Sequence, residues 1–201
     1  MLEAAEADAV VDTSAFLARL GAVAPAVVRG PLEQQAQVWI GMARHGGRPP
    51  SSHNLRPARQ QAPSVTPWSG TLFTSSTSPL GASMWRSYLE LYRGSDLYPL
   101  PWHVWSVPAE GRVAQITGAK DWVSLVDRYP RRVDELVYPD WEAVATDFDG
   151  VHICLRAVVS LQGFSYVSSR GVTAPGYWDV ETTHWLRWVF QRPRLLEVVG
   201  S

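Results

Sequence analysis

Some segments of this chain have the two-residue hydrophobic period of β-strands, and others have the period of α-helices. The two kinds of segment do not alternate regularly along the sequence. A doubly wound parallel sheet would need a helix after nearly every strand. The order therefore predicts an α+β domain with split, mostly antiparallel β-sheets and flanking helices. Strands are expected at residues 37–45, 70–76, 102–107, 112–117 and 150–155, a strand pair at 178–190, and helices at 81–92, 119–129 and 139–148. Residues 157–176 are expected to be rich in loops.

The chain has 201 residues, of which 46% are hydrophobic and 18% charged, so it can bury the core of one domain. Residues 1–30 contain many good helix formers, and Gly30 and Pro31 end that pattern. The sequence therefore predicts an N-terminal helical extension over residues 1–30. A single α+β domain is expected over residues 31–201.

Charge and cysteine content narrow the classes of protein that this chain can represent. A formal net charge of −1 gives no overall attraction to nucleic acid, although arginines gather between Arg44 and Arg59. The single Cys154 cannot form an internal disulfide, and no secretory signal or long apolar run is present. We therefore expect a cytoplasmic protein without a membrane segment. Paired cysteines are absent and the histidines are scattered, so no metal site is expected.

The first candidate site lies where an expected strand leads into a helix. Gly70 opens this strand and the hydroxyl residues Thr74, Ser75 and Ser76 close it. Hydroxyl groups at a strand end can bind a ribose or an amide, and the backbone can come close to a ligand at a glycine. The helix that follows carries Trp85, which could stack against a planar ring. The simpler interpretation is a polar strand end followed by a helix cap.

Two further segments carry charged groups. Asp179 and Glu181 are two residues apart in an expected strand, so both should point to the same face of the sheet. Arg44 and His45 end the first expected strand, where a cation could bind a phosphate. The simpler interpretations are a solvent-facing edge strand for the acidic pair and a charged strand end for the basic pair.

In this order the three segments resemble the ADP-ribosyltransferase family. The similarity runs over about residues 37–190. It implies that Arg44 or His45 anchors NAD and that the Thr74-Ser75-Ser76 strand, with Gly70 and Trp85, lines the nicotinamide pocket. It also implies that Glu181, with Asp179, is catalytic. The sequence departs from a strict Ser-Thr-Ser strand, and Asp179-Val180-Glu181 replaces the usual Glu-x-Glu or Gln-x-Glu. Parts of the chain also resemble uncharacterised actinobacterial and phage proteins.

The resemblance implies a toxin-like transferase that uses NAD as a substrate. The expected reaction is transfer of ADP-ribose to a protein or nucleic-acid acceptor, or hydrolysis of NAD. Trp68 and Tyr166 are additional candidates for stacking on the nicotinamide. The alternative is a non-catalytic, Trp-rich binding module, because the chain has ten Trp residues and Trp is enriched at interface hot spots.

Overall fold

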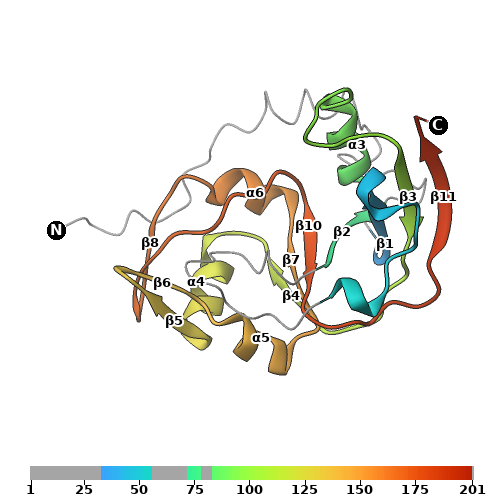
Figure 1. The fold of residues 1–201 in the computed structure, drawn as a ribbon. Helices are drawn as coiled ribbons and strands as arrows, with labels where there is room; N and C mark the ends of the chain where they lie inside the picture. Colours follow the sequence, from blue (N-terminus) through green and yellow to red (C-terminus); the bar gives the residue numbers. More distant parts are fainter. Residues whose placement is uncertain (1–32, 56–71, 78–82, 201) are drawn as a thin grey trace.

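The computed structural model describes residues 33–55, 72–77 and 83–200. In this part of the chain two β-sheets are packed with helices, which confirms the predicted α+β class (Figure 1). The expected helical extension over residues 1–30 lies outside the described residues, as do Gly70 and Trp68.

The larger sheet has seven strands in the order β11-β3-β1-β2-β10-β7-β4. Their bounds are β1 Glu33–Gly41, β2 Leu72–Thr77, β3 Trp102–Ser106, β4 Val113–Ile116, β7 Gly150–Ile153, β10 Thr182–Trp185 and β11 Arg194–Val199. All neighbours pair antiparallel except β4 and β7, which are parallel. The predominance of antiparallel pairs agrees with the sequence prediction, and it places the ends of β1, β2 and β10 beside one another.

The smaller sheet has four strands in the order β5-β6-β9-β8. Its strands are β5 Pro130–Val133, β6 Leu136–Pro139, β8 Tyr166–Ser168 and β9 Gly171–Thr173. β5 and β6 form a hairpin, β8 and β9 form a second hairpin, and β6 joins them through a parallel pair with β9. This sheet lies beside α4 at the end of the molecule remote from β11 (Figure 1).

The α-helices are α3 Met84–Leu91, α4 Ala119–Arg128, α5 Trp141–Asp147 and α6 Leu155–Leu161, and the short 3-10 helices are η1 Ala43–His45 and η2 Ser52–Asn54. Side-chain caps fix the starts of two helices. Ser83 accepts a hydrogen bond from the backbone N–H of Arg86, and Asp140 accepts from those of Glu142 and Ala143. Among the described residues no helix is long and apolar enough to cross a membrane.

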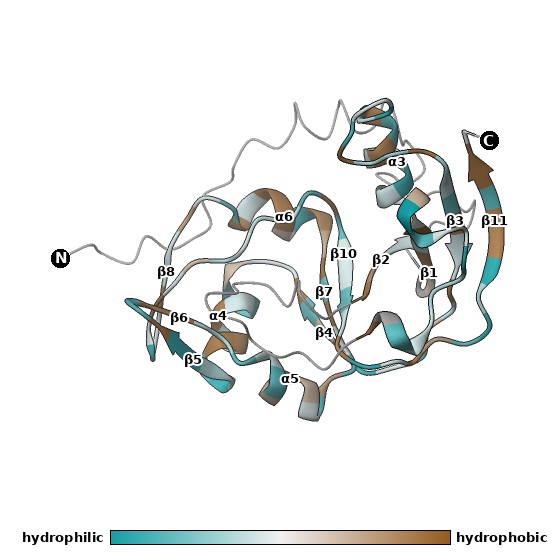
Figure 2. Cartoon of the chain, viewed as in Figure 1, coloured by the Kyte–Doolittle hydropathy of each residue, from teal (hydrophilic) through white to brown (hydrophobic). Residues whose placement is uncertain are grey.

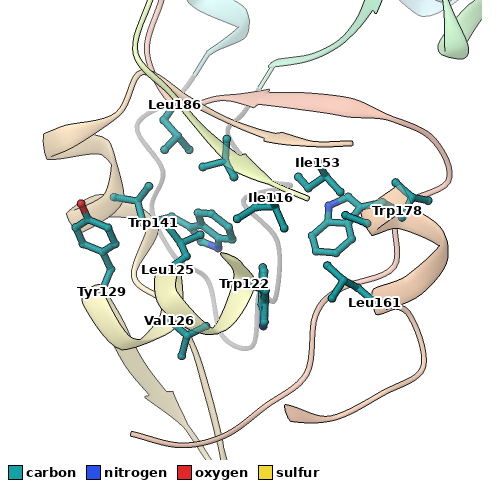
Figure 3. Close-up of a cluster of buried hydrophobic side chains, with 14 of the residues drawn as sticks. Ile116, Trp122, Leu125, Val126, Tyr129, Trp141, Ile153, Leu161, Trp178 and Leu186 are labelled. Carbon is teal, nitrogen blue, oxygen red and sulfur yellow. The ribbon is translucent and has the colours of Figure 1, made fainter. Parts of the chain in front are cut away.

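Helices cover two regions of the large sheet, and each region has its own apolar core. α4, α5 and α6 pack against β4 and β7 around Trp122, Trp141 and Leu161 (Figure 3). α3 packs against β1, β3 and β11 through Leu89 and Trp102. A third cluster contains Trp39 and Trp185. Most Trp side chains therefore lie in the hydrophobic cores, and each Trp in the described part of the chain is buried or half-buried.

Several element boundaries differ from the sequence prediction. The strand pair expected over 178–190 is reduced to the single strand β10, and residues 179–181 form a bend before it. The strand expected over 37–45 begins earlier and ends at Gly41, where η1 follows. The expected loop over 157–176 contains most of α6, together with β8 and β9. The β5–β6 hairpin and β11 were not predicted, because their polar or short strands lack a clear alternating pattern.

We predict that Leu161→Ala lowers the free energy of unfolding by about 2–5 kcal/mol, because Leu161 is fully buried and the truncation leaves a cavity. Urea denaturation followed by tryptophan fluorescence measures this change. The matched control is Val167→Ala, because Val167 is 65% exposed and its truncation should change stability by less than about 0.5 kcal/mol. Equal effects of the two substitutions would contradict this placement of α6.

Candidate functional site

The most unusual feature of the fold is a buried carboxylate at the centre of the large sheet. Glu181 has 0% exposure and directly precedes β10. Its Oε2 atom accepts a hydrogen bond of 2.7 Å from Ser75 Oγ, and its oxygens lie 3.2 and 3.3 Å from the backbone nitrogen of Ser76. The end of β2 thus supplies the hydrogen-bond donors that a buried carboxylate requires.

Burial strongly affects the ionisation of Glu181. It raises the pKa of the carboxyl to about 7, against the opposing effect of hydrogen bonds from the Ser75 and Ser76 hydroxyls and the Ser76 N–H. The carboxyl therefore titrates close to neutral pH and not in the usual acidic range. A carboxyl group with a pKa near the working pH in a polar site is characteristic of functional sites.

A second hydrogen-bond network lies next to Glu181. The indole N–H of Trp185 donates to Thr74 Oγ1 at 2.6 Å, and the Thr74 hydroxyl donates to Oε1 of Gln37. The Gln37 amide in turn donates from Nε2 to Ser76 Oγ at 3.1 Å. Gln37 is directly opposite Ser76 in the β1–β2 pair. These contacts tie β1, β2 and β10 together through buried side chains.

His152 of β7 approaches the carboxylate from the other neighbouring strand. Its Nδ1 atom lies 3.0 Å from Thr183 Oγ1 and 3.5 Å from Glu181 Oε1. Burial lowers the pKa of His152 to about 4, so the imidazole is neutral at pH 7 and the contact with Glu181 is not an ion pair there. Burial, reinforced by the nearby His152, lowers the pKa of His184 to about 3.

A very small pocket lies beside this polar cluster, with a cavity volume of about 10 Å³, which is scarcely room for one water molecule. Phe73 and His184, which are opposite each other in the β2–β10 pair, contribute to it from the sheet. Trp85 of α3 and Trp178 are further walls, and Asp179 is a polar member of the lining. Ser75 points to the same face of β2 as Phe73, because residues two apart in a strand share a face. The Ser75–Glu181 contact therefore lies on the side of β2 that faces the pocket.

A group of tyrosines lies beside Trp85, one of the residues that line the pocket. Tyr88, Tyr92 and Tyr98 have ring centroids 4.7–6.0 Å apart, and Tyr88 also packs edge-on against Trp85. Burial raises the pKa of Tyr98, the Asp179 charge also raises it, and the Arg44 charge lowers it. Arg44 and Asp179 are therefore both within electrostatic range of the Tyr98 hydroxyl.

The residues predicted from the sequence fall into two groups. Glu181, Ser75 and Ser76 are in direct contact, and Thr74 joins them through Gln37. Arg44 and His45 lie beyond the end of β1 at Gly41, whereas Gln37, further back in β1, pairs with Ser76. The two basic residues are therefore remote from Glu181 along the strand. Gly70 lies outside the described residues.

The expected common orientation of Asp179 and Glu181 is wrong. Both residues precede β10 in a bend, where strand alternation does not apply, and Asp179 is exposed while Glu181 is fully buried.

His45 packs edge-on against Trp39 at 5.3 Å, and its Nδ1 atom accepts from the backbone N–H of Met42. Tyr166 packs against the core around α4 and α6, so it does not line the pocket.

Sequence reasoning missed the residues that complete the site. These residues are Gln37, His152 and Trp185, each of which lies within an expected strand. The only available signal was a polar residue within an otherwise apolar strand, and this signal does not indicate what the residue contacts.

Among the described residues no group of His, Cys, Asp and Glu could hold a metal ion.

Comparison of the chain with protein-family models, with curated proteins and with solved structures finds no match. Any functional assignment therefore depends on the chemistry of these residues.

We predict that Glu181→Gln becomes more stable relative to the wild type as pH rises from about 4.5 to 7. The folded protein binds the Glu181 proton more tightly than the unfolded chain does, so wild-type stability is lost over this interval. The shift corresponds to about 3 kcal/mol at most. Urea denaturation at several pH values measures the difference. The contributions of His152 and His184 to the free energy of unfolding rise with pH. They are common to both proteins and largely cancel in the difference between them. A difference independent of pH would contradict the raised pKa.

Proposed function

We propose that the chain binds NAD and breaks its nicotinamide–ribose bond, and that ADP-ribose passes to a protein or nucleic-acid acceptor or to water. The observation that carries this proposal is the 2.7 Å hydrogen bond between Ser75 and the buried Glu181, beside an aromatic pocket. The resemblance in motif order places the same two residues at the reacting bond. Their direct contact is what a shared role would require.

The chemistry suits a single buried carboxylate. When the bond between nicotinamide and the ribose C1′ breaks, the electron pair leaves with the ring nitrogen and positive charge develops on the sugar. A nearby carboxylate stabilises this charge more strongly in the transition state than in the ground state. The acceptor or water then bonds to C1′ and loses a proton. Glycosidases use carboxylates in the same way.

The side chains that line the pocket have the chemical character expected for binding the leaving ring once the site has opened. The nicotinamide of NAD is planar and cationic, and aromatic side chains bind such rings by stacking and by cation–π attraction. Phe73 and Trp85 would provide the aromatic surfaces, and Asp179 would contribute negative charge at the rim. The positive charge of the ring is lost when the bond breaks, so Asp179 would favour bound substrate over released nicotinamide.

Arg44 is the better candidate for the phosphate anchor. It is exposed, and its charge lowers the pKa of Tyr98, a member of the tyrosine group beside Trp85. His45 instead packs against Trp39, and burial, followed by the Arg44 charge, lowers its pKa. A neutral imidazole attracts a diphosphate less than a guanidinium does.

Glu181 is fully buried in this conformation, so NAD must open the site before reaction. The bend at residues 179–181 is the natural place for this movement, because it lies between the pocket lining and the first residue of β10. Movements of such segments commonly control access to active sites.

We predict that Glu181→Gln reduces nicotinamide release from NAD by about 10²–10³-fold, because an amide cannot stabilise the charge on the ribose as a carboxylate does. Ser75→Ala should cause a smaller reduction. Chromatographic measurement of free nicotinamide at pH 8 tests both variants. Glu135→Gln is the control, since Glu135 is exposed in the turn between β5 and β6 and should retain wild-type release. The proposal fails if wild type releases no nicotinamide or if Glu181→Gln equals wild type.

A second candidate function, a non-catalytic binding module, is favoured by one observation at the edge of the sheet. β11 is an edge strand and is mainly hydrophobic (Figure 2). Leu195, Leu196 and Val198 are between 38% and 43% exposed. Edge strands with exposed apolar side chains can pair with another chain.

If β11 mediates association, light scattering after size exclusion should show an oligomer, and Leu196→Lys should convert it to a monomer. The control is Leu97→Lys, because Leu97 is 69% exposed outside this strand. A monomeric wild type at all tested concentrations would count against self-association through this edge.

A further inference from the structure

Two histidines of this protein differ in how firmly their surroundings fix the position of the ring proton. The backbone N–H of Met42 donates to Nδ1 of His45 at 2.8 Å. An amide N–H can only donate, so the proton of the neutral His45 ring must lie on Nε2. Nδ1 of His152 instead lies 3.0 Å from Thr183 Oγ1. A hydroxyl can donate or accept, so this contact is compatible with a proton on either nitrogen of His152.

The carboxyl group of Glu181 can decide between the two tautomers of His152. Its Oε1 atom lies 3.5 Å from His152 Nδ1, and the two residues are 0% and 4% exposed. Charges and dipoles interact strongly where water is excluded. A carboxylate attracts an N–H at Nδ1 and repels a lone pair there. A protonated carboxyl has the opposite preference, because its O–H can donate to the lone pair.

Strand pairing and hydrogen bonds hold the two groups at this separation. His152 is directly opposite Thr183 in the β7–β10 pair, and Glu181 lies two residues before Thr183. The Ser75 hydroxyl and the Ser76 backbone N–H of β2 bind the carboxylate. The contact between Nδ1 and Oε1 is therefore built into the meeting of three strands.

We infer that His152 is a positioning residue whose tautomer follows the charge of Glu181. When Glu181 is ionised, the ring proton lies on Nδ1 and points toward the carboxylate. When Glu181 is protonated, its O–H donates to Nδ1 and the ring proton lies on Nε2. Ionisation thus moves the carboxyl proton to Nδ1 and releases the Nε2 proton to water, so one proton leaves the pair.

The catalytic part of this inference rests on the proposed function. A neutral N–H donor would stabilise the ionised Glu181 that the ribose requires without adding a positive charge beside the developing cation. The tautomer change itself does not depend on the identity of any substrate.

The neighbours of the pair allow the tautomer change to be measured separately from other titrations. Burial lowers the pKa of His152 to about 4 and that of His184 to about 3, so both rings are neutral above pH 5.5. β4 places Gln115, which does not titrate, opposite His152. Asp179 is exposed, where solvent screens its charge. Burial raises the pKa of Glu181 to about 7, so its charge changes within this range.

The experiment is a long-range proton–nitrogen correlation spectrum of protein labelled at histidine nitrogen, in which the two ring-nitrogen shifts report the tautomer. We expect His152 to change from the Nε2–H form at pH 5.5 to the Nδ1–H form at pH 8.5, with a midpoint near pH 7. In Glu181→Gln this pH dependence should disappear. His45 is the internal reference, because its neutral form should remain Nε2–H in both proteins.

Substitution of His152 tests the reciprocal effect on Glu181. We expect His152→Leu to raise the Glu181 pKa by about one unit, because a donor stabilises a carboxylate more than an acceptor stabilises a neutral carboxyl. His152→Asn should retain the wild-type pKa, since its amide can turn to donate or accept. NMR titration of the Glu181 carboxyl carbon in glutamate-labelled protein measures both. His103→Leu is the control, because β1 and β2 separate His103 of β3 from Glu181.

The wild-type spectrum keeps the inference falsifiable even if His152→Leu does not fold. A His152 tautomer that stays the same between pH 5.5 and 8.5 would overturn it. A pH-dependent tautomer that persists in Glu181→Gln, or an unchanged Glu181 pKa in folded His152→Leu, would also overturn it.

A kinetic measurement separates this inference from the proposed function. If NAD is the substrate, His152→Leu should lower kcat about tenfold at pH 6 and less at pH 8.5, because the ionised fraction of Glu181 falls as its pKa rises. KM should change less than about twofold, and His152→Asn should retain wild-type kcat. A wild type that shows the tautomer change but does not cleave NAD would reject the proposed function and support the role of His152. NAD cleavage with a constant tautomer would do the reverse.

Discussion

The antiparallel pairing of β2 with β10 joins the two regions of the large sheet. On one side of it lie β1, β3 and β11, covered by α3; on the other lie β7 and β4, packed with α4, α5 and α6. Three opposed residue pairs form the junction, from Thr183 with Thr74 to Trp185 with Leu72. Glu181 lies at the end of this junction, so the arrangement of the site depends on how the two regions meet.

The polar composition of the junction carries an energetic cost. Burying a carboxyl group and several hydroxyls is unfavourable unless each finds a partner, and a junction of apolar side chains would avoid this cost. Here the partners come from three strands, including Gln37 of β1 and His152 of β7. A network of this kind restricts the strands to one register, since a shift by one residue would separate every donor from its acceptor.

Much of the secondary structure could be predicted from the sequence, because α3, α4 and most central strands have clear periodicity and caps such as Ser83. Residues 178–190 are expected to form a strand pair because Thr, Trp and Val favour strands, yet residues 179–181 form a bend, and Glu181 accepts a hydrogen bond from Ser75 there. The resemblance in motif order implies only that Ser75 and Glu181 belong to one site, and their direct hydrogen bond is a finding of the structure. Gln37 and His152 could not be found in this way, because their importance depends on strand neighbours distant in sequence.

The hydrogen bond between Trp185 and Thr74 crosses the junction between the two regions. Indole N–H protons give well-resolved signals in proton–nitrogen correlation spectra, and their exchange with solvent requires the hydrogen bond to open. The exchange rate of the Trp185 proton is therefore a measure of the free energy needed to separate β2 from β10. The Trp122 proton, bonded to Thr173 in a different core, gives the corresponding value for the region around α4. The protein thus contains an internal pair of probes that can distinguish local opening of the junction from unfolding of the whole domain.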